Sequence, residues 1–299
     1  MPRVTAIITT FNRASYLAHA IRSALDQTHR DLELLVLDNS STDATADVVR
    51  GFVDARLRYI RHPPATIAGA RNLGIREATG DYVAYLDDDD EWLPDKTERQ
   101  LSLLVGGSSR LGLVYGGFVR VDTNGAEFET HAPALRGRVL EALLWQRDAF
   151  TGSASNPMMP TRVMRSLGGY NDAITTSEDW ELYLRLAERY DVDYVPETVV
   201  RIRAHRGSRL GDRIREAGHV EEMVLERYKA TMPPRLLSFY LQKIGGKLCR
   251  TGSIVEGRER IRDAIRVNRF NGVAYLQFVA SYLGHRRYQQ IHAYYKRLF

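Results

Sequence analysis

The chain of 299 residues has very little cysteine and no long apolar run. Its single cysteine, Cys249, excludes an internal disulfide and any zinc site built from several cysteines, which is compatible with a reducing compartment. No apolar stretch approaches the roughly 20 residues of a spanning helix. The longest one near the C-terminus, Gly272 to Gly284, is interrupted by Gln277. No signal-peptide pattern precedes the strand-like run Val4–Thr9, so we expect a cytoplasmic protein.

The charges are unevenly distributed, although the overall composition is ordinary. Hydrophobic residues make up 44% and charged residues 26% of the chain, as in a typical globular enzyme. The net charge is +5, but 21 of the 42 Lys and Arg and only 8 of the 37 Asp and Glu lie from residue 200 onward. The basic tail has two explanations: solvated helix faces, or attraction to an anionic surface or substrate.

The first ninety residues alternate between two patterns. Apolar β-branched runs alternate with segments whose apolar residues recur at helical spacing. We expect strands at Val4–Thr9, Leu32–Leu37, Leu57–Arg61 and Tyr82–Leu86, and helices at Ala14–Leu25, Asp43–Val53 (capped by Ser40-Ser41-Thr42) and Ala68–Ala78. This order predicts an α/β fold with a mainly parallel sheet, in which ligands bind beyond the carboxyl ends of the strands.

The patterns are more mixed in the middle of the chain and helical after residue 210. We expect strands at Leu113–Tyr115, Phe118–Asp122, Ser155–Pro160, Val192–Val195 and Val199–Arg203, and helices at Val139–Gln146 and at Glu178–Tyr190, with Ser177 as its cap. Breaks in the helical tail are expected at Pro233-Pro234, Gly252, Asn271-Gly272 and Gly284.

Four consecutive acids, Asp87–Asp90, follow the fourth strand. Such carboxylates repel one another and need a cation or hydrogen-bond donors. Hard oxygen ligands suit Mg²⁺ or Mn²⁺. An EF-hand calcium loop is a poor fit, because Trp92 stands where that loop needs glycine. The alternative is a solvated acidic loop.

Two further acids stand at positions where ligand chemistry is common. Asp38 ends the second strand, where an acid can accept hydrogen bonds from a base or a ribose. Asp179, next to Glu178, stands at a helix start and could act as a general base. Each also has a structural alternative: Asp38 as a turn or cap residue, and Asp179 as a simple helix cap.

Taken in order, these segments resemble the inverting family-2 glycosyltransferases with a GT-A fold. The resemblance covers roughly residues 3–206. It rests on Ile8-Thr9-Thr10-Phe11-Asn12-Arg13, Leu37-Asp38-Asn39-Ser40-Ser41-Thr42-Asp43, Ala70-Arg71-Asn72-Leu73-Gly74, Gly80-Asp81 through Asp90, Gly168-Gly169-Tyr170-Asn171 and Glu178 through Leu186. Asn39 and Ser40 depart from the family's usual Asp and Gly. The chain after residue 210 shares no motif with the family.

The resemblance implies a GT-A type fold, that is, a Rossmann-like sheet flanked by helices. The helical pattern after residue 210 predicts a helical C-terminal extension. It implies a catalytic domain over residues 1–209, with a nucleotide-binding part at 1–105 and an acceptor part at 106–209. Residues 210–299 would form a separate helical region. The expected donor is a nucleotide-diphosphate sugar, with UDP- or dTDP-sugars favoured.

The same resemblance assigns roles to individual residues. The residues implied on the nucleotide side are Thr9, Phe11, Asp38, Arg71, Asp87 and Asp88. Asp38 would bind the base, and Asp87, the first acid of the D-x-D motif, would face the ribose. Asp89, the last acid of that motif, would hold Mn²⁺ or Mg²⁺ on the diphosphate, with His205 as a second metal ligand. Asp179 would be the catalytic base, with Glu178 and Trp180 on the acceptor side.

The function implied is transfer of the sugar to a hydroxyl by one metal-assisted displacement with inversion. The acceptor would be a glycan, a lipid-linked glycan or a small molecule, in polysaccharide, glycolipid or natural-product glycosylation. A nucleotidyltransferase is an alternative, but Thr9–Arg13 is not the glycine-rich phosphate loop that such enzymes carry. An inactive sugar-nucleotide-binding relative is another. A nucleic-acid-binding protein is not expected, because the conspicuous cluster is acidic and no nucleic-acid motif is present.

The segment Phe270–Phe299 combines aromatic and basic residues. The aromatic and apolar ones include Tyr275, Phe278, Tyr282, Tyr288, Tyr294, Tyr295 and Leu298, and the basic ones Arg286, Arg287, Lys296 and Arg297. A basic amphipathic segment can lie on an anionic membrane, here the inner face of the cell membrane. The alternative is a helical cap that packs on the catalytic domain or on a second copy in a homodimer.

Overall fold

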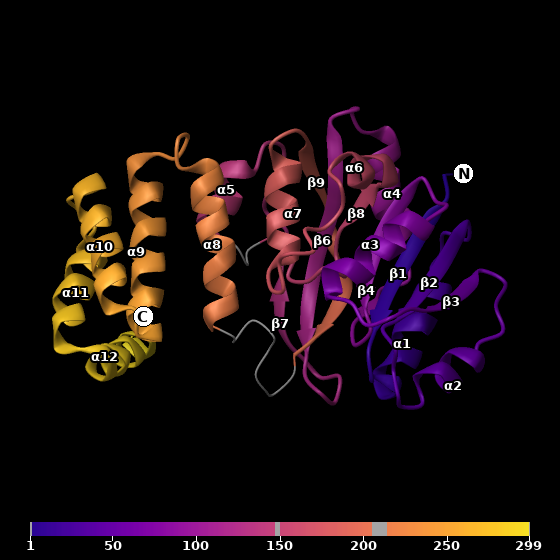
Figure 1. Ribbon diagram of the computed structural model, residues 1–299. Coiled ribbons are helices and arrows are strands. Elements are labelled where there is room, and N and C mark those ends of the chain that lie inside the picture. The colour runs from indigo at the N-terminus through magenta and orange to yellow at the C-terminus, as the bar shows by residue number, and fades with distance from the viewer. Residues whose placement is uncertain (1, 147–149, 205–213, 299) are drawn as a thin grey trace. The chain divides into compact units, whose positions relative to one another are not determined.

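The computed structural model describes residues 2–146, 150–204 and 214–298 (Figure 1). The chain forms two compact units, Met1–Gly207 and Ser208–Phe299. The first is an α/β unit built on one mixed sheet, and the second is entirely helical in its described part.

The first half of the α/β unit is the parallel sheet that the sequence predicts. Its strands run side by side in the order β3-β2-β1-β4 and are joined by helices. The elements are β1 (Val4–Thr10), α1 (Ala14–Leu25), β2 (Leu32–Asp38), α2 (Thr45–Arg50), β3 (Leu57–Arg61), α3 (Ile67–Glu77) and β4 (Tyr82–Asp87).

The register of this sheet places two acids at its carboxyl edge. Thr10 of β1 pairs with Asp38 of β2, and Thr9 pairs with Asp87 of β4. Neighbouring strands are about 4.8 Å apart, so the backbones of Asp38 and Asp87 lie roughly 10 Å apart across the end of β1.

The second half of the sheet continues beyond β4 in the order β8-β6-β9-β5, and β7 pairs with β6. Only β6 and β9 are parallel to each other here. The elements are β5 (Glu91–Trp92), α4 (Lys96–Gly106), β6 (Leu111–Val121), β7 (Glu127–His131), α5 (Leu140–Trp145), β8 (Met158–Pro160), α6 (Thr161–Ser166), α7 (Glu178–Ala187) and β9 (Asp191–Arg203). The elements β5, β7, α4 and α6 were not predicted.

Two long strands replace the four short ones that the sequence predicts. β6 runs unbroken through Gly116-Gly117, and β9 runs through Pro196-Glu197, with irregular register between them. A Cβ on Gly116 would lie 2.7 Å from Val199 Cγ2, so glycine at this point lets the two strands approach closely. The glycine pair is therefore a packing feature and not a break.

Two predicted helix caps are wrong. α2 begins at Thr45 without a side-chain cap from Ser40-Ser41-Thr42, and the Asp43 carboxylate accepts the Thr45 N–H instead (3.0 Å). Ser177 stands at the N-cap position of α7, but its side chain makes no capping hydrogen bond. The predicted strand Ser155–Pro160 is shortened to Met158–Pro160, because the side chains of Ser155 and Asn156 hydrogen-bond to other segments.

The two faces of β1 pack against different helices. Val4, Ala6 and Ile8 belong to the apolar core that contains the buried side chains of α1 and α4. Ile7 points to the opposite face, where α3 lies. Gly74 of α3 is the point of closest approach: a Cβ there would lie 2.7 Å from Ile7 Cγ2 and 3.1 Å from Leu37 Cδ1.

The helical unit follows the breaks that the sequence predicts. Its helices are α8 (Ile214–Tyr228), α9 (Pro234–Thr251), α10 (Ile254–Val267), α11 (Gly272–Ala280) and α12 (His285–Leu298), with the short 3₁₀ helix η2 (Ser281–Leu283) after α11. Within the described residues, none of the helices has both the length and the apolar character needed to cross a bilayer.

We expect Gly74→Ala to destabilise the protein by about 1–3 kcal/mol, because the new methyl group would overlap the stiff β-branched side chain of Ile7. This loss must exceed the gain of up to about 1 kcal/mol that alanine brings to a helix. Gly106→Ala is the matched control, since a Cβ there meets nothing within 4 Å. Urea unfolding measures both. Equal stability of the two variants would show that α3 does not depend on this contact.

Candidate active site

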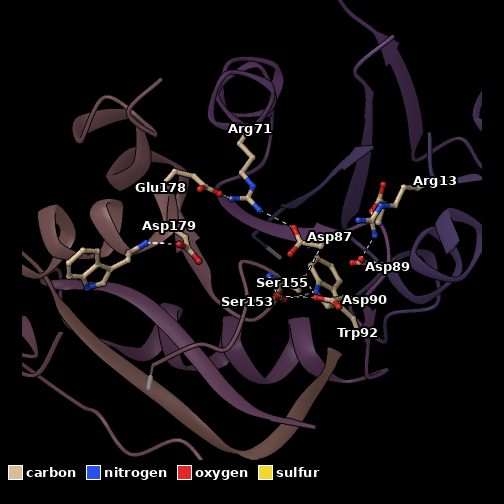
Figure 2. Close-up of polar contacts among 12 residues, drawn as sticks. Arg13, Arg71, Asp87, Asp89, Asp90, Trp92, Ser153, Ser155, Glu178 and Asp179 are labelled. Carbon is tan, nitrogen blue, oxygen red and sulfur yellow. Dashed lines mark hydrogen bonds and ion pairs between the residues drawn. The ribbon is translucent and has the colours of Figure 1, made fainter. Parts of the chain in front are cut away.

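The acidic run forms a tight turn between β4 and β5, and its carboxylates lie in different surroundings; Figure 2 labels Asp87, Asp89 and Asp90. The Asp90 N–H donates to the Asp87 carbonyl (3.1 Å), which closes the turn. The loop is therefore not a uniformly solvated acidic segment, and each acid needs a separate account.

Asp90 is an anchor inside the protein. Its carboxylate accepts hydrogen bonds from Ser153 Oγ (2.9 Å), Ser155 Oγ (2.6 Å) and the Arg203 N–H (2.9 Å). Burial raises the pKa of Asp90 well above its ordinary value. The Ser155 Oγ also accepts the Asp87 N–H (2.9 Å). This buried network holds the loop against β9, and no motif in the sequence points to either serine.

Asp87 is joined to α7 by one arginine. Arg71, on α3, donates to Asp87 Oδ1 (2.9 Å) through one guanidinium nitrogen and to Glu178 Oε1 (2.7 Å) through the other. The Arg71 side chain is buried, and its guanidinium carbon lies 5.8 and 5.3 Å from the ring centres of Tyr85 and Tyr170. Three segments that are far apart in the sequence thus meet at one charged group.

Asp179 belongs to the same constellation. It is only partly buried, and its Oδ1 accepts the Trp180 N–H (2.7 Å). Burial first, and then the negative charge of Asp179 among others, raises the pKa of both Asp87 and Glu178. Figure 2 shows Asp179 beside Glu178, on the side of the site toward Asp87. The structure therefore brings the predicted base and the first acid of the D-x-D motif together.

Asp88 and Asp89 face the loop that follows β1. Arg13 forms an ion pair with Asp89 and lies 3.9 Å from Asp88. Asp88 is buried, and this burial, with the neighbouring carboxylates, raises its pKa to about 7. Two carboxylates, Asp88 and Asp89, therefore face the single cation Arg13 at this edge of the site, and their mutual repulsion favours binding of a further cation.

The donor set fits a divalent cation that is completed by its substrate. Among residues 2–146, 150–204 and 214–298, no three His, Cys, Asp or Glu side chains gather in a way that could hold a metal alone. Mg²⁺, however, is commonly bound through one or two carboxylates together with the phosphates of a substrate and water. Asp89 forms an ion pair with the guanidinium group of Arg13. A carboxylate that attracts this cation can also attract a divalent metal ion. His205 lies outside the described residues.

Asp38 is more deeply buried than its predicted role implies. It is 1% exposed, and its two carboxylate oxygens accept hydrogen bonds from the Ser41 N–H (2.8 Å) and the Tyr59 hydroxyl. Burial and the bond to Asp38 raise the pKa of Tyr59 to about 12. Asp38 thus helps to fix the turn after β2.

The loops around the site contain unusual backbone conformations. Among the described residues, the non-glycine positions with positive φ are Asn12 (53°), Ser40 (63°) and Ser177 (62°). They follow β1 and β2 and precede α7. Such conformations cost of the order of 1–3 kcal/mol each and are commonly retained near functional sites. The Asn12 side chain accepts the Thr42 N–H (2.8 Å) and so joins the first two loops.

The remaining predicted residues lie in different surroundings. Phe11 is 55% exposed at the carboxyl edge of the sheet, and Thr9 is partly exposed next to it. Trp180, predicted on the acceptor side, has a buried ring whose N–H donates to the Leu143 carbonyl (2.9 Å). This bond and the burial make Trp180 an interior packing residue of α7. Sequence reasoning gave no role to Arg13, although it ends the first motif.

We expect Arg71→Ala to destabilise the protein by about 3–5 kcal/mol, because it would leave the buried Glu178 and the partly buried Asp87 without their cation. Arg50→Ala is the control, since Arg50 pairs with Asp47 on the surface and its loss should cost within about 0.5 kcal/mol. Chemical denaturation of both variants measures the difference. An Arg71→Ala protein as stable as the wild type would contradict the bridging role.

The comparisons with known proteins agree with this architecture. The model of the family "Glycosyl transferase family 2" matches residues 5–168. A putative teichuronic acid biosynthesis glycosyltransferase of Bacillus subtilis, TuaG, is 30% identical over 172 residues, which cover 54% of this chain and 68% of TuaG. An uncharacterized glycosyltransferase of Rickettsia felis is 26% identical over 210 residues, or 68% of this chain. The matched segment spans only 34% of that relative's length.

Solved structures show the same fold at low sequence identity. Residues 1–349 of S. aureus TarS, in complex with UDP-GlcNAc, align with a TM-score of 0.68 at 15% identity, covering 99% of this chain and 92% of that one. The mannosyltransferase PcManGT of Pyrobaculum calidifontis, with GDP-Man and Mn²⁺, aligns with a TM-score of 0.61 at 20% identity, covering 94% and 80%. The family match extends over more than half of the chain, so this protein belongs to glycosyl transferase family 2 and has a GT-A fold.

Proposed function

We propose that the protein transfers a sugar from a nucleotide-diphosphate donor to an acceptor hydroxyl, with inversion at the anomeric carbon. The observation that carries the proposal is the Arg71 bridge, which holds the acidic loop and the start of α7 in one site. TarS with UDP-GlcNAc and PcManGT with GDP-Man provide support, because they combine this fold with such donors.

The nucleotide would lie along the carboxyl edge of β1, β2 and β4. Asp87 would face the ribose, and the exposed ring of Phe11 offers a surface for the base beside Thr9. Asp38 would act at the base end of this edge, where its hydrogen bonds already fix the turn after β2. Arg71 would stand beside the nucleotide and keep Asp87 oriented. A UDP- or dTDP-sugar is our preferred donor.

Asp89 would hold the divalent cation, Mn²⁺ or Mg²⁺, with His205 as a further candidate ligand. Such a cation, when bound, stabilises negative charge on the departing diphosphate. Asp88 lies between Asp87 and Asp89 on the nucleotide side, and a cation bound nearby would favour its charged form. Arg13 pairs with Asp89 and would turn to the donor phosphates when a cation takes its place.

Asp179 is the proposed general base. The adjacent Glu178 is buried and already receives a hydrogen bond from Arg71, so it is committed to positioning. Asp179 is partly exposed and therefore accessible to an acceptor. It would take the proton from the acceptor hydroxyl as that oxygen attacks the anomeric carbon and the bond to the diphosphate oxygen breaks. One such displacement inverts the anomeric centre and requires no covalent enzyme intermediate.

The acceptor class that we propose is a glycan or lipid-linked glycan of cell-envelope polysaccharide synthesis. The support is the similarity to TuaG, which is described as a teichuronic acid biosynthesis glycosyltransferase. Other products, such as glycolipids or small-molecule glycosides, have no comparable support.

We expect Asp89→Ala to abolish metal-dependent nucleotide binding, because it removes a hard oxygen ligand. A thermal-shift screen of UDP, GDP, dTDP and CDP with Mn²⁺ first identifies the base, since a ligand that prefers the folded state raises the melting temperature. Calorimetry with that nucleotide, with Mn²⁺ or with EDTA, then tests the variant. Asp95→Ala is the control, because Asp95 pairs with Arg99 at the surface. Unchanged affinity of Asp89→Ala in Mn²⁺ would refute the assignment.

We expect Asp179→Asn to lower turnover on the order of 10²–10⁴-fold while donor affinity is largely kept, because only proton transfer is impaired. Release of the nucleoside diphosphate from the matching sugar donor measures turnover. Glu188→Gln, at the opposite end of the same helix, controls for loss of charge on α7. Normal turnover in Asp179→Asn would mean that the base is another group. Release of pyrophosphate would instead indicate a nucleotidyltransferase. Absence of turnover in the wild type would indicate an inactive relative.

A further inference from the structure

The helical unit has an exposed apolar face that its own core does not use. Five side chains of α11 and η2 are exposed: Tyr275, Leu276, Val279, Tyr282 and Leu283, with Leu276 at 64% and Val279 at 67%. At about 100° per residue, Tyr275, Leu276 and Val279 fall within an arc of roughly 100° on α11, and Tyr282 and Leu283 follow directly in the 3₁₀ turn η2. Phe270, just before α11, is 87% exposed. Ala274 and Ala280, on the other side of α11, are buried.

Arginines lie next to this strip of exposed side chains in space or in the sequence; we call the strip the α11 face. Arg258 of α10 stacks on the Tyr282 ring at 3.8 Å from its centre and donates to Ser281 Oγ (3.1 Å). Arg262 lies 5.8 Å from the centre of the Phe278 ring. Exposed arginines also precede and follow the strip at Arg269, Arg286 and Arg287. The surface therefore has an apolar centre with a cationic border.

We propose that the α11 face docks on the surface of an anionic lipid bilayer. Exposed Leu, Val and Tyr side chains can enter the boundary between headgroups and acyl chains, while arginines remain at the level of the lipid phosphates. α11 has nine residues, so it lies in the interface and does not span. The sequence Gly272–Ala280 contains no charged residue, so α11 can enter the boundary between lipid headgroups and acyl chains without burying a charge.

Charge decides between a membrane and a second copy of this chain. Two copies that met through the α11 face would bring the arginines of both borders together, and such like-charge contacts are unfavourable. An anionic bilayer complements the same border, and each arginine near its surface strengthens binding about fivefold. This inference does not depend on the proposed chemistry, because it concerns residues of the helical unit alone.

The test is co-sedimentation of the full chain with vesicles of phosphatidylcholine alone or with one quarter phosphatidylglycerol. We expect binding to the anionic vesicles only, weakened by salt. Leu276→Ser/Val279→Ser should weaken it on the order of tenfold or more, because two apolar anchors are lost. Arg286→Gln/Arg287→Gln should weaken it about 25-fold.

Matched controls separate docking from general effects of mutation. Val53→Ser/Val105→Ser removes two exposed valines of the α/β unit, and Arg50→Gln/Arg76→Gln removes two of its arginines. Both should bind like the wild type. Circular dichroism melting of every variant verifies that the fold is kept. The proposal is overturned if the wild type does not bind anionic vesicles at low salt, or if the α11 variants bind normally. It is also overturned if light scattering shows a dimer that only the α11 variants dissociate.

Discussion

The geometry of the α/β unit depends on one buried cation. Arg71 satisfies a carboxylate at the end of β4 and another at the start of α7, and two tyrosine rings cover it. Burying a guanidinium in this way is unfavourable unless good hydrogen bonds compensate for the lost water. The two carboxylates provide them, and in return Arg71 fixes the distance between the acidic loop and α7. The close packing of Gly74 against Ile7 keeps α3, and with it Arg71, near the sheet.

The four neighbouring acids illustrate how burial separates residues of the same type. Asp90 turns inward to two serines and a backbone N–H, Asp87 turns to Arg71, and Asp89 turns to Arg13. Burial raises the pKa of Asp88 to about 7, although Thr10 and Arg13 both favour its charged form. The inward anchor makes the loop rigid enough for the remaining acids to present a localised negative potential, which is a suitable environment for a cation and a diphosphate.

The charge asymmetry of the chain now has a structural meaning. The acidic excess before residue 200 includes the loop and the start of α7, where the proposed chemistry takes place. The basic excess after it includes the arginines that border the α11 face. Solvated helix faces alone do not explain why these arginines adjoin exposed apolar side chains. The proposed docking would place the enzyme at a membrane, where lipid-linked acceptors are found.

The sequence by itself determined the parallel half of the sheet, the helix breaks of the tail and the family. These follow from local causes: apolar periodicity sets strands and helices, proline and glycine end them, and the ordered motifs need only adjacent residues. The tertiary structure alone decided that β6 and β9 are continuous, that Asp38 and Trp180 are buried, and that Ser153 and Ser155 hold the acidic loop. It also decided that Arg71 joins Asp87 to Glu178, although Arg71 and Glu178 are 107 residues apart in the sequence. Contacts of this kind depend on which segments meet in space, and no local pattern of the sequence encodes that.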